Sequence, residues 1–567
     1  MVVMENERKP KRAIACDNCK QEFVISDDEK KFFEKVKVPY PKLCSQCRSQ
    51  RRWAVRNQNK LYKRKCDFTG KSMISLYSPD SKHKVYAEGI WWGDKWNPMD
   101  YGRNFDFTRP FFEQFRELQL DVPRRGMHQD GTNENCEYTT FGMSNKDCYL
   151  AFACFFSENC YYSSLLIKGK ECIDCLIVNE GELLYGCVDS SRCYHSFYLQ
   201  DCNDCLDCYL LKSCNNCKNC IGCANLSNKS YYIYNEKASK QEYQELKEKL
   251  EKGELEKERE KFNKWVVGQP QRYAHMVSSE NSEGDYLYNC KNCYDCFSLL
   301  NGAEDSRHCQ LGGLQAKDMV DCTMSGQQIE LIYEMQATTG AYMSAFTNFC
   351  RFSKNVYYCD SISSCTDCFG CIGLNNKSNC IFNKQYSKEE YQHLLPKIIE
   401  HMKGTGEWGE NFPIKNSPFP YNDTLAQEYY PLTEEAARSR GYQWKKEGKK
   451  PELEQKFVIN KDIDLVSDKV LSEVLVCEKC GNGYRIIPQE FRLYKILKVS
   501  IPTLCPDCRH SKRMAQRNPM KLYSRQCMCE ESGHDHAGRC KNEFETTYTP
   551  ERPEKVYCES CYQKSVI

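Results

Sequence analysis

The sequence predicts a mainly β protein made of two tandem, cysteine-rich parallel β-solenoids with a 12-residue sequence repeat and a small α+β domain at each end. Three observations lead to this prediction. A twelve-residue motif recurs in the middle of the chain, the repetitive array returns 148 residues later, and the two chain ends match each other at an offset of 461. Repetition at a short fixed period is typical of stacked structural units.

The first array divides into seven units of twelve residues from position 146, beginning with KDCYLAFACFFS and ending with KNCIGCANLSNK. Within each unit the fourth position is aromatic or isoleucine, and Asn, Asp or Glu is frequent at the second. The apolar period is not 3.6, which argues against helices, while aromatic and β-branched residues between turn-forming residues favour strands. One solenoid turn takes either one unit or two.

The cysteines of this array recur in columns. All fifteen cysteines between positions 136 and 223 share one phase of three, and where a column lacks cysteine it holds residues such as Leu184, Ser196 or Val178. A ligand column would accept histidine or aspartate, whereas a packing column accepts small apolar residues, and a free cysteine behaves as one. We therefore predict packed thiols, with metal capture by exposed C-x-x-C pairs as the alternative.

The second array is a copy of the first. Residues 218–243 return as residues 366–391, and the second copy loses its phase near Cys309 and Cys322, which predicts insertions at its corners. Each copy ends in a capping-box pattern, Ser239 with Glu242 and Ser387 with Glu390. These patterns predict helices at about 239–263 and 387–403, which we expect to cover the open end of each stack.

Each chain end carries two C-x2-C pairs separated by 24 residues. Four thiolates at such spacing form a closed tetrahedral zinc site, which stabilises a fold rather than supplying catalysis. Redox pairs or buried thiols are the alternative. The predicted ligands are Cys16, Cys19, Cys44 and Cys47 in the first copy, and Cys477, Cys480, Cys505 and Cys508 in the second.

The segment CDNC…F…YPKLCSQCR resembles a bacterial probable zinc-binding domain of the zinc-ribbon or treble-clef type. The resemblance covers about 40 residues at each end and implies zinc and small α+β zinc-binding domains. The whole arrangement resembles large cysteine-rich zinc-ribbon proteins of uncultivated small-genome bacteria. That likeness implies an architecture without implying an activity.

A third zinc site is predicted near the C-terminus, where the two ends match at an offset of 471. The C-terminal copy has Cys558 and Cys561 where the N-terminal copy has Ala87 and Ile90, and two further cysteines also lack counterparts. The predicted ligands are Cys529, Cys540, Cys558 and Cys561, with His534 and His536 as substitutes. We thus expect about three zinc ions per chain.

Basic residues concentrate at the two ends. The net charge is +10 for residues 1–66 and +5 for residues 477–567, which leaves −13 for the middle. In both copies, basic residues recur every fourth position on a predicted helix, forming a stripe that phosphate would meet, although a solvated face is the alternative. The predicted nucleic-acid contacts are Arg48, Arg52, Arg56, Lys60, Arg64, Arg509, Arg513, Arg517, Lys521 and Arg525.

These observations predict a zinc-stabilised, non-enzymatic scaffold that binds RNA or DNA, with structured or ribosomal RNA as one candidate, and protein partners on the solenoid surface. A β-helix enzyme acting on carbohydrate is an alternative by fold analogy alone, although Asp201, Asp204 and Asp207 fit turns better than a catalytic groove. Metal buffering or thiol chemistry is a further alternative. The charged start, the mean hydropathy of −0.72 and the lack of an 18-residue apolar run predict a cytoplasmic protein without a membrane span.

The sequence also predicts domain boundaries. They are 1–66 (first zinc-binding domain with its basic helix), 67–125 (degenerate ribbon hairpin and aromatic connector), 126–265 and 266–403 (the two solenoids with their helices), 404–470 (connector), 471–526 (second zinc-binding domain) and 527–567 (third zinc ribbon).

Overall fold

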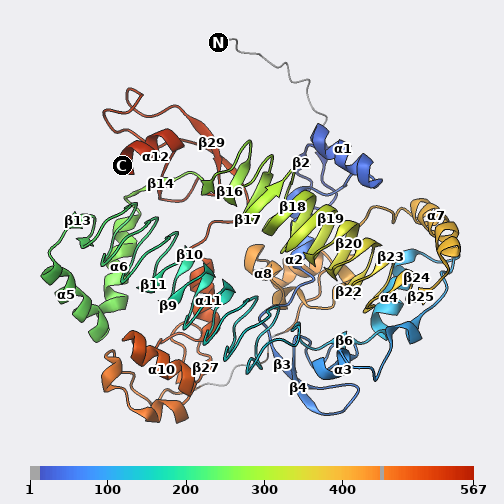
Figure 1. Cartoon of the computed structure of the whole chain (residues 1–567), viewed down its shortest axis with the longest axis horizontal. Coiled ribbons are helices and arrows are strands. Elements are labelled where there is room, and N and C mark those ends of the chain that lie inside the picture. Colours follow the sequence, from blue (N-terminus) through green and yellow to red (C-terminus); the bar gives the residue numbers. More distant parts are fainter. Residues whose placement is uncertain (1–12, 447, 449–452, 567) are drawn as a thin grey trace.

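The computed structural model describes residues 13–446, 448 and 453–566. It confirms that the chain is mainly β, with a large mixed sheet and few helices. Two stacks of parallel turns lie side by side in Figure 1, the first stack (residues 129–237) in cyan and green and the second stack (residues 276–385) in yellow-green and yellow. The predicted first domain and the predicted connector extend in part outside the described residues.

In the first stack, residues pair in parallel with residues twelve positions later, as Lys146 does with Glu158 and Tyr149 with Tyr161. One twelve-residue unit therefore makes one turn. Longer pairings follow the same spacing, such as Leu166 with Val178. The strands involved are β7 (Ser164–Ile167), β8 (Leu176–Asn179), β9 (Glu182–Tyr185), β10 (Val188–Ser191) and β11 (Tyr194–Phe197).

Almost every third residue of the stack has a left-handed backbone, which divides each turn into four bends. Asp201, Asp204 and Asp207 occupy three such bends, with φ values of 55°, 55° and 50°. Aspartate and asparagine tolerate this conformation better than other residues with a side-chain Cβ. The three aspartates are thus turn formers, and the residue after each bend, often cysteine, is buried inside the turn.

The buried thiols are hydrogen-bonded to the backbone. Cys172 Sγ lies 3.4 Å from the carbonyl oxygens of both Lys170 and Gly181, so that it bridges its own turn and the next. Cys208 repeats this arrangement in the same column three turns later. A thiol must be protonated to donate to a carbonyl, and burial raises the pKa of the Cys154 thiol. This arrangement supports packed thiols in the core.

The second stack forms an eleven-stranded sheet that includes β16 (Glu283–Tyr288), β17 (Tyr294–Glu304), β18 (Gln310–Thr323), β19 (Gln327–Thr339) and β20 (Tyr342–Arg351). Phe297 pairs with Gln310, and Met319 pairs with Ile332, a spacing of thirteen. The spacing returns to twelve where Ile332 pairs with Ser344. The predicted insertions near Cys309 and Cys322 are confirmed by this shift of register.

Both predicted capping boxes are present, at Ser239 with Glu242 and Ser387 with Glu390, and Ser26 with Glu29 forms a third. They open α1 (Asp27–Val36), α5 (Lys240–Lys249) and α7 (Lys388–Gly404). A π-helical turn, Leu250–Glu254, joins α5 to α6 (Leu255–Val266). The side chains of α5 and α6 cover the aromatic column of the first stack, which includes Tyr209.

At the last turn of each stack, an asparagine side chain pairs with the backbone amide and carbonyl of one residue. In the hairpin of β12 (Tyr232–Ile233) and β13 (Glu236–Lys237), the Asn235 side chain accepts from the Ala224 amide at 2.9 Å and donates to its carbonyl at 3.0 Å. Asn383 makes the same pair of bonds to Ile372, both at 2.8 Å. An amide side chain satisfies a donor and an acceptor that the missing next turn would have paired.

The end domains cross over to the distant stack (Figure 1). The helices α1 and α2 (Ser45–Trp53) of the N-terminal domain pack on the second stack, where Phe33 meets Tyr333. The helices α10 (Pro488–Leu497) and α11 (Pro506–Met514) of the C-terminal domain pack on the first stack, where Tyr494 meets Tyr185. Each end domain therefore packs on the stack that is more distant from it in the sequence.

The hairpins that follow the two end domains lie beside the other stack, the one nearer to them in the sequence. The hairpins are β3 (Tyr62–Lys65) with β4 (Ser72–Ser75), and β28 (Tyr523–Gln526) with β29 (Glu543–Thr546). After them, β5 (Val85–Tyr86) pairs with β6 (Arg124–Arg125) before the first stack, and β30 (Lys555–Tyr557) pairs with β14 (Pro270–Arg272) before the second. Each duplicated end thus contacts both stacks.

The two ends meet each other at equivalent positions. Lys60 Nζ lies 3.0 Å from a carboxylate oxygen of Asp507, and Gln46 Nε2 lies 3.3 Å from the carbonyl oxygen of Met520. Gln46 and Asp507 correspond at the offset of 461, and Met520 precedes the counterpart of Lys60. The internal duplication is therefore arranged about a pseudo-twofold axis. Within the described residues, no helix combines the length and apolarity needed to cross a bilayer.

We expect Cys172→Ala to lower the free energy of unfolding by about 1–2 kcal/mol, because it leaves a cavity where a sulfur is packed. The metal content of the protein should not change. Urea denaturation and elemental analysis measure the two quantities, with the exposed Lys170→Ala as the matched control. Loss of a metal ion from the Cys172→Ala variant would show that this column holds ligands.

Candidate metal centres and the arginine contacts beside them

The first cluster joins Cys16, Cys19, Cys44 and Cys47, whose sulfurs all lie within 4.8 Å of one another. Cys16 and Cys19 lie in the turn between β1 (Ile14–Ala15) and β2 (Glu22–Phe23), while Cys44 caps α2 and Cys47 is in its first turn. The amide of Cys44 donates to Cys16 Sγ at 3.3 Å. A neighbouring thiol, Cys47, lowers the pKa of Cys44 to about 5, as expected where thiolates gather at a helix N-terminus.

The second cluster repeats this geometry with Cys477, Cys480, Cys505 and Cys508. The Cys480 and Cys505 sulfurs are 3.7 Å apart, the same separation as between Cys19 and Cys44. Burial raises the pKa of Cys477, but backbone N–H donors lower it to about 6 overall. Both predicted four-cysteine sets are thus brought together in a form that could hold a metal ion.

The third cluster differs from the prediction by one residue. Cys540, Cys558 and Cys561 are joined by Cys527, not by Cys529. The amide of Cys558 donates to Cys527 Sγ at 3.2 Å, and in the N-terminal copy the amide of Ala87 donates to Cys66 Sγ at 3.3 Å. The predicted set contains only cysteines that are absent from the N-terminal copy. Cys527 was left out because its N-terminal counterpart, Cys66, is also a cysteine.

Cys529 belongs to a neighbouring set. Its sulfur, one nitrogen each of His534 and His536, and Cys561 Sγ all lie within 4.8 Å of one another. Both histidines that the sequence offered as substitutes therefore lie beside Cys529. Across the described residues, the groups of three or more potential ligands all lie at the two chain ends, and none includes a thiol of either stack.

The basic stripe of the N-terminal copy faces the protein interior. The helix α2 ends at Trp53, so the predicted basic helix stops before Arg56. Arg48 Nε lies 2.6 Å and Arg52 Nη1 lies 3.1 Å from the carboxylate oxygens of Asp321 in the second stack. These side chains are at most 2% exposed. The anion that meets the stripe is a carboxylate of the same chain.

The C-terminal copy reproduces this contact on the first stack. Arg509 and Arg513 approach the two oxygens of Asp174 at 3.0 Å and 2.6 Å. Arg517 pairs with Asp189 at 2.7 Å. The repetition of these arginines in both copies therefore reflects an equivalent carboxylate in each stack.

The other predicted phosphate contacts also have partners within the chain. Arg56 bonds the side chain of Gln58 and lies over the ring of Phe141, and Arg64 pairs with Asp67 at 2.8 Å. Lys60 pairs with Asp507, and Arg525 donates to the carbonyl of Thr549. Lys521 is exposed. Burial and the paired carboxylates thus keep the buried arginines out of reach of an external anion in this structure.

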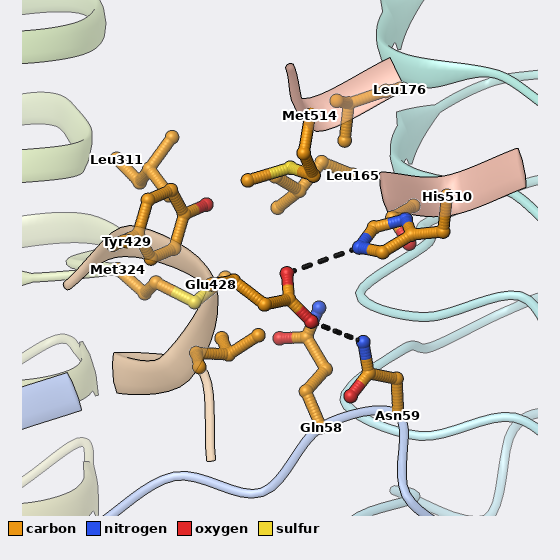
Figure 2. A pocket seen from close by; sticks show the side chains of 12 residues that line it. Gln58, Asn59, Leu165, Leu176, Leu311, Met324, Glu428, Tyr429, His510 and Met514 are labelled. Carbon is orange, nitrogen blue, oxygen red and sulfur yellow. Dashed lines mark hydrogen bonds and ion pairs between the residues drawn. The ribbon is translucent and has the colours of Figure 1, made fainter. Parts of the chain in front are cut away.

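A small pocket lies between the two halves at the pseudo-twofold axis (Figure 2). Glu428, in α8 (Ala426–Tyr429), accepts hydrogen bonds from His510 Nε2 at 3.0 Å and Asn59 Nδ2 at 2.6 Å. Leu165 of the first stack and Leu311 of the second line it together. Although burial raises the pKa of Glu428, His510 lowers it overall. The predicted connector thus supplies one carboxylate that ties both end copies together, and no sequence pattern marked it.

A partly buried histidine connects α1 to the second stack. His308 lies between Asp295 Oδ2 at 2.7 Å and Glu29 Oε1 at 3.0 Å. Burial lowers the pKa of His308, but the two carboxylates raise it to about 10. Burial raises the pKa of Glu29, but His308 and the Ser26 cap lower it to about 2 overall. The capping box therefore also supports the docking of the helix.

Comparisons with known proteins add little. No family model matches the chain, and no curated protein sequence matches it. Among solved structures, a UDP-N-acetylglucosamine acyltransferase from Campylobacter jejuni aligns over 51% of this chain and 94% of its own, with 10% identity and a TM-score of 0.08. A score of this size carries no argument about fold or function.

We expect Asp321→Asn to lower the free energy of unfolding by about 3–5 kcal/mol, because it leaves two buried guanidinium groups short of a charge partner. The control is Asp507→Asn, whose pair with Lys60 is exposed and should contribute less than about 1 kcal/mol. Chemical denaturation measures both. Equal effects of the two substitutions would contradict the proposed importance of the buried contact.

The stabilising effect of His308 should depend on pH. A histidine whose pKa is raised on folding stabilises fully below its unfolded pKa of about 6.5, and this contribution is lost as the pH rises to about 10. The difference in unfolding free energy between the wild type and His308→Gln should therefore shrink between these two values. His393→Gln, at an exposed position, should show no such trend. A difference that grows with pH would refute the assignment.

Proposed function

We propose that this chain is a zinc-stabilised, non-enzymatic scaffold in which small zinc-binding domains hold two parallel β-solenoids together. The single observation that carries the proposal is the direct succession of Cys47 and Arg48. Cys47 lies in the first four-cysteine cluster, and the next residue pairs with Asp321 of the second stack. Cys508 and Arg509 repeat this succession on the first stack.

Zinc is the metal that the clusters favour by their chemistry. Four thiolates suit Zn²⁺ in tetrahedral coordination, whereas oxygen-seeking Mg²⁺ and Ca²⁺ disfavour sulfur. Such a site leaves no position for water or substrate, so its contribution is to folding. With the metal bound, the first turn of α2 or α11 is fixed, and the arginines that follow are held toward their carboxylates. Zinc binding is thereby coupled to assembly of the two stacks.

The observations favour this role over the alternatives. Asp201, Asp204 and Asp207 form bends and have partners within the chain, such as Tyr286 for Asp201 and Arg192 for Asp204. They therefore do not support a carbohydrate-active groove. The stack thiols bond to backbone carbonyls, which disfavours metal buffering. We do not include nucleic-acid binding in this proposal, because the buried arginines offer no surface to a phosphate backbone. The proposal also makes no use of protein partners on the stack surfaces.

The zinc content of matched variants tests the proposal. We expect Cys44→Ser/Cys47→Ser to lose one zinc ion per chain and to unfold at lower urea concentration, because the ligands and the docking of α2 fail together. The control, Cys214→Ser/Cys217→Ser, changes a C-x-x-C pair of the first stack and should keep all zinc. Elemental analysis of protein purified without oxygen gives both counts.

Two outcomes would contradict the scaffold proposal. If the purified protein contained no zinc, the metal would not be part of the folded structure. Loss of metal from the control pair, with ten or more ions in the wild type, would instead show that the stack cysteines are ligands and would favour metal buffering.

A further inference from the structure

The C-terminal copy of the ribbon hairpin contains an insertion that is rich in metal ligands. Cys66 and Lys71 close a short turn in the N-terminal copy, where the Cys66 amide donates to the Lys71 carbonyl. Cys527 and Asn542 make the same bond around a turn that is ten residues longer. The extra residues carry two cysteines and two histidines, which are Cys529, His534, His536 and Cys540. One tetrahedral site together with Cys527, Cys558 and Cys561 cannot use all of them.

The unused ligands converge on one side of the third cluster. Cys529 Sγ lies 3.1 Å from His534 Nδ1, and Cys561 Sγ lies 3.4 Å from His536 Nε2. All four ligand atoms lie within 4.8 Å of one another, and Cys561 belongs to both sets. The two cysteines are buried, and the two histidines are partly buried. Two sets of four ligands therefore meet at one sulfur.

Each histidine is oriented by its second ring nitrogen. His536 Nδ1 lies 2.8 Å from the Gly538 carbonyl, which fixes the proton there and leaves the lone pair of Nε2 toward Cys561. His534 Nε2 lies 3.5 Å from a carboxylate oxygen of Glu531, and its Nδ1 faces Cys529. An acceptor behind the imidazole is the usual support of a metal-binding histidine.

We propose that the C-terminal ribbon holds a binuclear zinc centre in which the Cys561 thiolate bridges the two ions. This proposal rests on the proposed function and extends it. One ion takes Cys527, Cys540, Cys558 and Cys561, and the other takes Cys529, His534, His536 and Cys561. Each ion then has four ligands and tetrahedral coordination, and the chain as a whole holds four zinc ions, not three.

The charge of this centre is nearly balanced. Five thiolates and two neutral imidazoles around two Zn²⁺ ions leave one negative charge, once each thiol has released its proton to water. Neighbouring N–H groups, such as the Cys558 amide on Cys527 and the Asn542 side chain on Cys558 at 3.4 Å, stabilise the sulfur charge. A surface hollow lined by His534, His536, Cys540, Cys561 and Lys564 gives an ion a path to the site.

The count of metal ions in the full-length protein tests this proposal. We expect four zinc ions per chain in the wild type and one fewer in His534→Ala/His536→Ala, which keeps the four sulfurs of the other set. Cys529→Ala provides an independent removal of the same ion. The matched control is His393→Ala, an exposed histidine on α7 that should leave the count unchanged.

Cobalt substitution tests the shared sulfur. Two Co²⁺ ions joined by one thiolate couple magnetically and lose electron paramagnetic resonance intensity. The His534→Ala/His536→Ala variant should therefore give a stronger signal than the wild type, although it contains less cobalt. Thermal melting establishes that each variant is folded before its metal is counted.

The possible results separate the two proposals. Three ions in the wild type, with no change in either variant, would overturn the binuclear centre and leave the scaffold proposal standing. Four ions that survive both variants would place the fourth ion elsewhere and also overturn it. A signal that simply follows the cobalt content would contradict the bridge, whereas a protein without any zinc would contradict the scaffold proposal as well.

Discussion

The structure depends on a carboxylate that is shared by two buried arginines. Asp321 receives Arg48 and Arg52, and Asp174 receives Arg509 and Arg513. A second carboxylate, Glu334 or Glu490, stands near each group and offsets the remaining positive charge. Buried charges are tolerated only where their partners are in place. A helix that slid or rotated on its stack would leave these charges unpaired, so the contact specifies one docked position.

The other features of the molecule follow from this contact. Each four-cysteine cluster includes the N-cap residue of the helix that carries the arginines and a cysteine of its first turn. Aromatic residues of the same domains fill the face of the stack beside them. Each end domain docks on the stack that is more distant from it in the sequence. This crossed docking connects the two halves of the molecule. At the axis, Glu428 joins Asn59 of one end copy to His510 of the other.

Local patterns in the sequence predicted the features that arise locally. The twelve-residue spacing, the two predicted capping boxes and the cysteine spacing of two clusters depend on residues close together in the chain, and they appear as expected. The sequence predicts phosphate contacts for the arginines because no acidic partner lies near them in the chain. Arg48 and Asp321 are 273 residues apart, and Arg513 and Asp174 are 339 apart. Cys527 is not predicted as a ligand, because the prediction used cysteines present in only one copy and its counterpart Cys66 is also a cysteine.

The crossed arrangement sets an order on the growth of the chain. Synthesis begins at the N-terminus, and domains fold as they emerge. The N-terminal domain must therefore leave the ribosome with Arg48, Arg52 and Phe33 uncovered until the second stack has been made. The C-terminal domain, by contrast, finds Asp174 already in place when Arg509 and Arg513 appear. A chain that stopped before Arg509 would therefore leave Asp174 of the first stack without its two arginines.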